Sequence, residues 1–239
     1  MSARVLVAMS GGVDSSVAAA LLVEQGFDVV GVTMRLSGGG SRCCSLDDVE
    51  DARRVADRLG IRFYVADYAD EFRRQVMEPF ADAYLAGRTP IPCVACNGRF
   101  KFHRLLERAR ALGAEAVATG HYARTAHDPE SGALALLRGA DPAKDQSYFL
   151  FDLGPAQLAR ARFPVGGLDK SEVRARAREL GLATADKPES MEICFVPDGD
   201  YAGVVEALRP GAAPGPGDVV DEQGRRVGRH GGVHRFTVG

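Results

Sequence analysis

The strongest constraint on the fold is a short strand that runs directly into a glycine-rich turn and a helix. Residues 4–8 (RVLVA) have the pattern of a short buried strand, the turn SGGVDSS follows at 10–16, and a helix is expected at 14–25. In such an arrangement glycines let a phosphate approach the backbone, N–H groups donate to it, and the helix N-terminus adds partial positive charge. The sequence therefore predicts a phosphate-binding loop at the start of an α/β sheet.

Strands and helices alternate along the first half of the chain. Further strands are expected at 28–34, 62–66 and 115–119, and helices at 46–59, 69–86 and 98–112. The helix at 46–59 has a capping signature, Ser45 with Asp48 three residues later. This alternation predicts a parallel sheet with helices on both faces. Ligands bind beyond the carboxyl ends of such strands, so Ser10, Met34 and Gly120, which follow three of these ends, should converge.

The pattern changes from about residue 122 onward. Two short strand candidates are followed by helices that predict a smaller, mainly helical domain, with the expected ranges 122–127, 133–138, 155–161 and 170–180. The stretch 209–217 (RPGAAPGPG) is a Pro- and Gly-rich linker, and 218–238 has the pattern of the first strands of a β-domain. Roughly twenty residues cannot bury a β-core of their own, so we expect a truncated form of a longer protein.

The composition is that of an average globular protein. The apolar fraction is 46%, the net charge is −2, and no apolar run approaches the roughly 18 residues that a membrane-spanning helix needs. The N-terminal apolar stretch is too short for a signal peptide, so a cytoplasmic protein is expected. Only four of the 30 basic residues are lysines, namely Lys101, Lys144, Lys170 and Lys187.

The glycine-rich turn is neither of the two commonest nucleotide-binding motifs. It lacks the Lys followed by Ser or Thr of a Walker A loop, and it is not the G-x-G-x-x-G of dinucleotide-binding proteins. Because the turn has no lysine, we expect backbone N–H groups and hydroxyls to hold the phosphates, with Mg²⁺ assisting.

The cysteines suggest chemistry rather than a structural framework. Their odd number in a cytoplasmic chain argues against a structural disulfide framework and favours metal binding or catalysis; they are Cys43, Cys44, Cys93, Cys96 and Cys194. The segment TPIPCVACN places two thiols three residues apart on a proline-rigidified loop expected to precede a helix, where a thiolate is favoured. A zinc site would need four ligands at short spacings, and the sequence has no second C-x-x-C.

Several segments together resemble one known family. The loop alone resembles the PP-loop of the ATP-pyrophosphatase superfamily, whose members split ATP between the α and β phosphates and transfer AMP to a substrate oxygen. The chain is similar over essentially its whole length to the tRNA-specific 2-thiouridylase family, whose members replace the 2-oxygen of the wobble uridine of tRNA with sulfur. The segments that carry this resemblance, in chain order, are SGGVDSS, CCSLDDVEDAR, TPIPCVACN, TGHYAR, KDQSYFL, ESMEICF and HRFTVG.

The resemblance implies a role for individual residues. Cys96 matches the family nucleophile, and Cys194 matches the cysteine that carries a persulfide. The positions that match ATP-binding residues are Ala8, Met9, Ser10, Gly11, Gly12, Val13, Asp14, Ser15, Met34 and Gly120. The positions that match tRNA-contacting residues are Ile91, Pro92, Cys93, His121, Lys144, Asp145 and Gln146. Some family members carry Asp in place of Cys93, and often Asn in place of Ile91.

The resemblance also implies a reaction and a domain plan. Adenylation would turn the 2-oxygen of the uridine at tRNA position 34 into a leaving group, and a persulfide on Cys194 would deliver sulfur, with Cys96 forming a disulfide that releases it. The implied cofactors are ATP and Mg²⁺, and the implied partners are tRNA and a persulfide donor such as a cysteine desulfurase or a sulfur-relay protein. The expected domains are an ATP-binding catalytic domain (1–140), a tRNA-contacting domain with the second cysteine (141–208), and a linker with an incomplete β-domain (209–239).

Three alternatives stay open at this stage. The same reaction could use an iron–sulfur cluster held by Cys93, Cys96 and Cys194, which leaves one iron open for sulfide. Another PP-loop ligase could act on a small metabolite. A dithiol oxidoreductase built on Cys93 and Cys96 would need no ATP and would give the phosphate loop no role.

Overall fold

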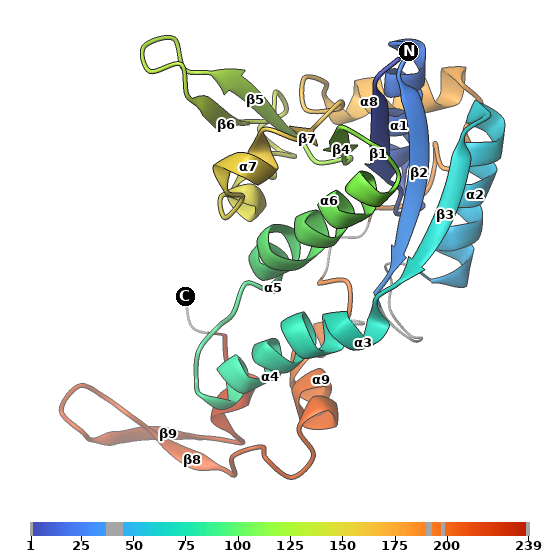
Figure 1. The fold of residues 1–239 in the computed structure, drawn as a ribbon. Helices are drawn as coiled ribbons and strands as arrows, with labels where there is room; N and C mark the ends of the chain where they lie inside the picture. The colour runs from blue at the N-terminus through green and yellow to red at the C-terminus, as the bar shows by residue number, and fades with distance from the viewer. Residues whose placement is uncertain (1, 37–44, 190–192, 197–198, 238–239) are drawn as a thin grey trace.

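The computed structural model describes residues 2–36, 45–189, 193–196 and 199–237 (Figure 1). Cys43 and Cys44, to which the sequence assigned no role, lie outside the described residues.

The centre of the molecule is a five-stranded parallel sheet, which confirms the predicted fold class. The strand order is β3-β2-β1-β4-β7. The strands are β1 (Arg4–Ala8), β2 (Asp28–Arg35), β3 (Arg62–Asp67), β4 (Ala116–Ala118) and β7 (Ala161–Arg162). The carboxyl ends of β1, β2 and β4 therefore meet at one edge of the sheet, because neighbouring parallel strands run in the same direction.

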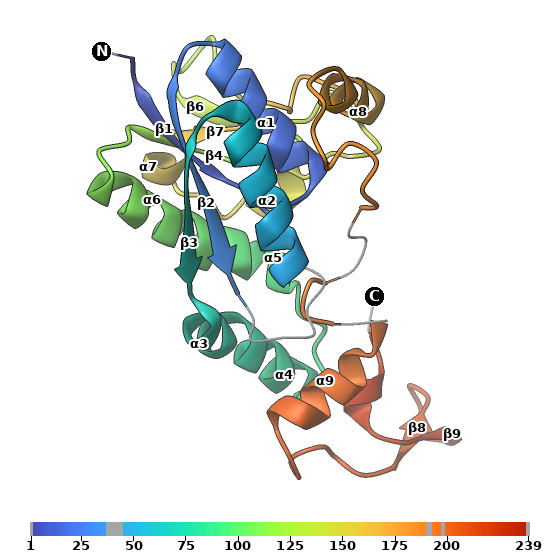
Figure 2. The same ribbon diagram turned by 90° about the vertical axis from the view of Figure 1, so that its right-hand side faces the viewer.

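Helices cover both faces of the sheet, as predicted. The helices α1 (Val13–Glu24), α2 (Leu46–Leu59) and α8 (Lys170–Glu179) lie on one face, and α6 (Phe102–Ala111) lies on the other (Figures 1 and 2). Successive side chains of a strand point to opposite faces. Val5 and Val7 accordingly join the apolar cluster on the α1 side, whereas Leu6 joins the cluster on the α6 side.

The start of α2 is fixed by the predicted capping box. The Ser45 hydroxyl accepts from the Asp48 N–H at 3.1 Å, and the Asp48 carboxylate accepts from the Ser45 N–H at 2.9 Å. Gly60 ends the helix in the left-handed conformation. Asp48 is thereby held beside the phosphate loop.

The connection between β3 and β4 differs from the prediction at one point. The expected helix at 69–86 is present as α3 (Ala69–Phe72), a π-helical turn (Arg73–Met77) and α4 (Glu78–Leu85).

The next helical segment was expected to start at 98, but it starts with α5 (Pro92–Ala95) and continues through a π-helical turn (Cys96–Lys101) into α6. Both thiols of the C-x-x-C pair thus lie in a helix, and their placement on a loop was wrong. Proline is readily accommodated in the first turn of a helix, and here Pro92 begins one.

Outside the sheet, two hairpins confirm the predicted strands. Strands β5 (Ala123–His127) and β6 (Leu134–Arg138) pair antiparallel, as do β8 (Gly217–Val220) and β9 (Arg226–His230). The helix α7 (Pro155–Leu158) is shorter than expected, and α8 is present as expected.

Two elements were not predicted. The strand β7 has only two residues and adds to β4. The helix α9 (Tyr201–Leu208) packs against α4, where the rings of Tyr84 and Tyr201 stack with centroids 4.9 Å apart (Figure 1). Two 3₁₀ turns, Ser147–Leu150 and Val233–Arg235, complete the elements used below.

Among the described residues, no helix is both long and apolar enough to cross a bilayer. The division of the chain into three domains stays a prediction, as does its cellular location.

Candidate active site

The phosphate loop (residues 10–16) joins β1 to α1 and is closed by hydrogen bonds between its own residues. The Ser10 N–H donates to the Ser15 hydroxyl at 3.1 Å, and the hydroxyls of Ser15 and Ser16 donate to the Gly12 carbonyl at 3.1 and 2.8 Å. No side chain caps the N-terminus of α1 at Gly12. The first N–H groups of a helix have no partner within it, so this end of α1 can donate to an anion.

Two glycines let other segments press closely on this loop. Gly11 has a φ of +73°, and a side chain there would meet the backbone of Asp48. A Cβ at Gly120, just after β4, would come within 2.6 Å of the Ser15 nitrogen and 2.7 Å of the Asp14 carbonyl carbon. Only a residue without a Cβ fits at Gly120 while the loop keeps its shape.

A cavity of about 250 Å³ lies at the carboxyl edge of the sheet. Its apolar wall comes from β1 and β2 and from Leu36, and its polar side from the phosphate loop and the segment after β4. The residues that line it are Ala8, Met9, Ser10, Asp14, Ser15, Val32, Met34, Leu36, Lys101, Thr119, Gly120, His121 and Gln146. The predicted convergence of Ser10, Met34 and Gly120 is therefore confirmed. We call this cavity the apolar pocket.

A second cavity of about 200 Å³ also lies at the phosphate loop and is rich in charged groups. Its lining residues are Ser10, Gly12, Val13, Asp14, Asp48, Tyr122, Lys144, Gln146, Lys170, Lys187, Pro188 and Glu189. Ser10, Asp14 and Gln146 line both cavities, so the two are neighbours. We call this second cavity the charged pocket.

The three lysines of the charged pocket are all paired with carboxylates. Lys170 contacts the two carboxylate oxygens of Asp14 at 2.7 and 2.8 Å and Glu189 at 3.1 Å. Lys144 contacts Glu189 at 2.7 Å. The hydrogen bond from Lys144, together with Lys170, holds the pKa of Glu189 below its usual value.

Lys187 is held on the opposite side of the charged pocket by α2. Its ammonium contacts Asp48 at 2.7 Å and Asp51 at 2.5 Å. Although burial opposes it, the hydrogen bonds from Lys187 and Ser45 lower the pKa of Asp48. The carboxylates of Asp48 and Glu189 are therefore ionised at neutral pH.

Tyr122 and His121 close the site from the side of β4. The Tyr122 hydroxyl donates to Asp14 at 2.7 Å, and burial, followed by this hydrogen bond, raises the pKa of Tyr122 well above its usual value. Burial, with a contribution from Lys101, lowers the pKa of His121 to about 3, so its imidazole is neutral at pH 7. Its Nδ1 lies 2.8 Å from the Thr119 hydroxyl.

The residues expected to contact tRNA fall into three environments. Ile91 is 45% exposed, Pro92 is buried and Cys93 is half-buried at the start of α5. Lys144 and Gln146 line the charged pocket, and the Gln146 side-chain oxygen accepts from the Tyr122 N–H at 3.0 Å.

Asp145 instead forms hydrogen bonds with residues near it in the sequence. Its carboxylate accepts from the N–H groups of Gly139 and Ser147 at 2.9 and 3.1 Å, and from the Ser147 hydroxyl at 2.9 Å. These bonds fix the turn that presents its neighbours Lys144 and Gln146. A direct contact between Asp145 and RNA stays a prediction.

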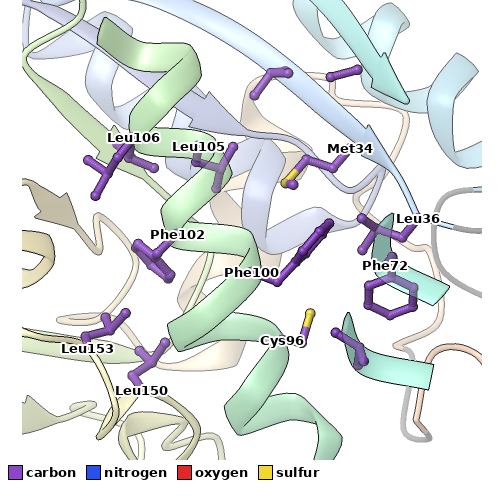
Figure 3. Close-up of a cluster of buried hydrophobic side chains, with 14 of the residues drawn as sticks. Met34, Leu36, Phe72, Cys96, Phe100, Phe102, Leu105, Leu106, Leu150 and Leu153 are labelled. Carbon is purple, nitrogen blue, oxygen red and sulfur yellow. The ribbon is translucent and has the colours of Figure 1, made fainter. Parts of the chain in front are cut away.

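The two expected sulfur-carrying residues pack against one apolar cluster. Cys96 is 8% exposed and lies in the cluster on the α6 side of the sheet, together with Phe72, Phe100 and Met34 (Figure 3). Cys194 is partly buried and packs against the same cluster. Met34 also lines the apolar pocket, so this cluster joins the pocket to the region of both thiols. Neither thiol lines either pocket, and their approach to the nucleotide site stays a prediction.

Within the ranges that the structure describes, no three His, Cys, Asp or Glu side chains are grouped as metal ligands. In this conformation Cys93, Cys96 and Cys194 thus do not form the ligand set that an iron–sulfur cluster would need.

Some residues of the site were not predicted. Lys170, Lys187, Asp48, Tyr122 and Glu189 line the charged pocket, but the sequence predicted none of them as a site residue. The rarity of lysine was the available signal, because every lysine of the chain lines one of the two pockets.

The chain has close relatives among known proteins. Residues 3–198 match the family model described as the tRNA methyl transferase HUP domain. A tRNA-specific 2-thiouridylase MnmA from Rhodospirillum centenum is 60% identical over 99% of this chain and 61% of its own length. One from Solibacter usitatus is 54% identical over 98% of this chain and 68% of its own length. The chain spans about three fifths of the length of several of the curated relatives it matches.

A solved structure supports the fold. A 4-thiouridine synthetase in complex with RNA and ATP superposes with a TM-score of 0.59 at 20% identity, covering 88% of this chain and 51% of that one. At this identity the likeness concerns the fold alone.

Proposed function

Because the chain belongs to the tRNA-specific 2-thiouridylase family, we propose that it activates the 2-oxygen of uridine 34 of tRNA with ATP and replaces this oxygen with sulfur. The observation that carries the proposal is the pair of neighbouring pockets on the phosphate loop, one apolar and one charged. Their chemistry suits the two ends of a nucleoside triphosphate. The 4-thiouridine synthetase of similar fold was solved with ATP, which agrees with this assignment.

The nucleotide would lie across the phosphate loop. The adenine ring fits the apolar wall formed by Val32, Met34 and Leu36, since bases bind by apolar contact and a few polar groups. The phosphates would accept from the N–H groups at the start of α1. The Asp14 carboxylate at the start of α1 offers a hard oxygen ligand that suits Mg²⁺, which would bind together with phosphate oxygens and reduce the negative charge of the phosphates.

The first chemical step is an adenylation. The 2-oxygen of the uridine attacks the α-phosphorus, the bond to the bridging oxygen breaks, and pyrophosphate leaves with the electron pair. The oxygen of the base is then part of an AMP leaving group. Buried surroundings protect the adenylated base from water.

The second step transfers sulfur from a persulfide on Cys194, which a donor such as a cysteine desulfurase or a sulfur-relay protein would supply. The terminal sulfur attacks carbon 2 of the base and AMP leaves, so that the base is joined to Cys194 through two sulfurs. The Cys96 thiolate then attacks the Cys194 sulfur, which forms a Cys96–Cys194 disulfide and releases 2-thiouridine. An external thiol must reduce this disulfide before the next turnover. The packing of both cysteines against one cluster supports the assignment.

The test separates the two steps. Enzyme in excess over unmodified tRNA, with ATP, Mg²⁺ and a persulfide donor, should yield 2-thiouridine by mass spectrometry of tRNA nucleosides, together with pyrophosphate. We expect Cys96→Ser and Cys194→Ser to keep pyrophosphate release while losing 2-thiouridine by at least about 100-fold, because adenylation needs neither thiol. Full thiolation by either variant would refute the persulfide relay.

Anaerobic purification distinguishes the iron–sulfur alternative. The relay requires an active preparation that contains no iron or acid-labile sulfide. Activity that appears only with bound iron would favour the cluster, and it would also require Cys93, Cys96 and Cys194 to come together from their present positions.

A further inference from the structure

The lysines of this chain are concentrated in one place. Only four of its 30 basic residues are lysines, and all four line the two neighbouring pockets at the phosphate loop. Arginine serves the ion pairs elsewhere on the described surface, for example between Arg176 and Glu24. Lysine is a compact charge that changes partners easily, which suits a site where an anionic ligand arrives and leaves.

Lys170 is the lysine of the charged pocket that forms an ion pair with the phosphate loop. Its ammonium contacts both carboxylate oxygens of Asp14, the acidic residue in the first turn of α1, and lies 5.7 Å from the centre of the Tyr122 ring. Its side chain is 12% exposed, compared with 31% for Lys144 and 28% for Lys187. It is therefore the most enclosed of the three lysines in the charged pocket.

The backbone of Lys170 is fixed independently of its side chain. Lys170 is the first residue of α8, and Asp169 caps this helix through a capping box with Glu172. The Lys170 N–H donates to Asp141 at 3.1 Å. The base of the side chain is thus anchored, while the ammonium at its end can exchange one anionic partner for another.

Asp14 and Lys170 lie where the phosphates are expected. The first turn of α1 favours an anion, and Asp14 is the acidic residue of this turn. A bound triphosphate with Mg²⁺ offers the same pair new partners. The carboxylate would bind the metal ion, and the ammonium would donate to phosphate oxygens.

We propose that Lys170 is a catalytic residue for the adenylation step, which contacts the phosphates of ATP and stabilises the charge that develops on the departing pyrophosphate. This inference rests on the proposed function. When the bond between the α-phosphorus and the bridging oxygen breaks, the electron pair stays on pyrophosphate, and the ammonium of Lys170 donates hydrogen bonds to it. No proton needs to be transferred. The loop itself supplies no cationic side chain, and Lys170 provides one from α8.

The other lysines of the charged pocket fit this role less well. Lys187 is held by two carboxylates of α2, Asp48 and Asp51, and neither lies in the loop. Lys144 contacts only Glu189 among the ion pairs of the described residues, so no ion pair joins it directly to the phosphate loop. Lys170 alone among these three lysines contacts a carboxylate of the loop.

The chain contains a matched control for the structural role of Lys170. Two ion pairs connect α8 to α1: Lys170 contacts Asp14 at the start of α1, and Arg176 contacts Glu24 at its end, at 2.7 Å. Only the first pair lines a pocket. Arg176→Ala therefore removes a contact between the same two helices without touching the site.

The test compares Lys170→Ala, Lys170→Arg and Arg176→Ala. In a single turnover with tRNA, we expect Lys170→Ala to lower the first-order rate constant of pyrophosphate release about 100- to 1000-fold, the usual loss when one charge-stabilising donor is removed. Lys170→Arg should recover a part of the rate, and Arg176→Ala should stay within threefold of the unmodified chain. The melting temperatures of Lys170→Ala and Arg176→Ala should agree. A rate for Lys170→Ala within threefold of that of Arg176→Ala would overturn the proposal.

A binding measurement keeps the inference separate from the proposed function. Calorimetry with ATP and Mg²⁺, and with AMP, needs neither tRNA nor a sulfur donor. We expect Lys170→Ala to weaken ATP binding at least about tenfold relative to Arg176→Ala, with AMP binding less affected. Equal ATP affinities in the two variants would contradict the role of Lys170. Failure of the unmodified chain to make 2-thiouridine would instead contradict the proposed function and leave the binding result standing.

Discussion

The phosphate loop is held by hydrogen bonds between its own residues, whereas the thiol region (residues 93–97 and 193–196) is held by apolar packing. In the loop, hydroxyls and N–H groups are already arranged around the place of an anion. In the thiol region, Cys96 is 8% exposed and packs with Phe72 and Phe100 (Figure 3). The nucleotide site is therefore preorganised, while Cys96 must become more exposed before it meets a macromolecular substrate.

The difference between the phosphate loop and the thiol region has a chemical explanation. Binding to prepositioned donors costs little reorganisation, which suits a ligand that must be held in one geometry for attack at phosphorus. A reactive sulfur is better covered until the substrate is activated, because an exposed thiolate oxidises. The two regions meet at Met34, which lines the apolar pocket and belongs to the cluster around Cys96.

The largest expected effect comes from breaking the packing around Cys96. Phe100 is 1% exposed and contacts the rings of Tyr68 and Phe72 edge-on. We expect Phe100→Ala to lower the free energy of unfolding by about 3–5 kcal/mol, measured by urea denaturation, and to accelerate the labelling of Cys96 by a thiol reagent. Phe151→Ala is the control, since that ring is 63% exposed and should cost less than about 0.5 kcal/mol. A small cost for Phe100→Ala would mean that the thiol region is not held by packing.

The next effect concerns the shape of the phosphate loop. At Gly120 a methyl group would come within 2.6 Å of the Ser15 nitrogen, so the loop must shift. We expect Gly120→Ala to destabilise the chain by about 1–3 kcal/mol and to weaken ATP binding strongly, measured by denaturation and calorimetry. A methyl group at Gly167 meets nothing within 4 Å, so Gly167→Ala should change neither quantity. Unchanged ATP binding by Gly120→Ala would show that the loop is not preorganised.

The smallest effect is a dependence of stability on pH. Since the pKa of His121 is about 3 in the folded chain and about 6.5 when unfolded, the unfolded state binds the extra proton first as the pH falls. Stability is thus lost between about pH 6.5 and pH 3. Between neutral pH and pH 5, the free energy of unfolding should therefore fall by about 1–2 kcal/mol less in His121→Asn than in the unmodified chain.

Urea denaturation at pH 7 and pH 5 measures this effect. His127→Asn serves as the control, because His127 is exposed and lies outside both pockets. An acid sensitivity that is the same in both variants would mean that His121 does not stay neutral in the folded chain.

The sequence correctly predicted the structural elements whose determinants lie within a few residues of one another. The apolar run of β1, the turn at 10–16 and the capping box at Ser45 act within a few residues, and all were predicted at their observed positions. The convergence of Ser10, Met34 and Gly120 followed from the parallel order of the strands.

The elements and contacts that the sequence did not predict depend on tertiary structure. The strand β7 has two residues and exists only because β4 offers it an edge, so no periodic pattern marks it. The prolines around residue 91 were interpreted as a break, although Pro92 begins a helix. Lys170 reaches Asp14 across 156 positions of sequence, a contact that only the packing of α8 on α1 creates. Tertiary contacts of this kind leave no signal in the local pattern.

The placement of the lysines gives this protein a chemical reporter. Amine-reactive reagents modify lysine and the N-terminal amine but not arginine, and every lysine lies in one of the two pockets. Acylation mapped by peptide mass spectrometry would therefore report almost exclusively on the occupancy of the site. Each lysine that a ligand shields marks one part of its footprint, without any engineered label.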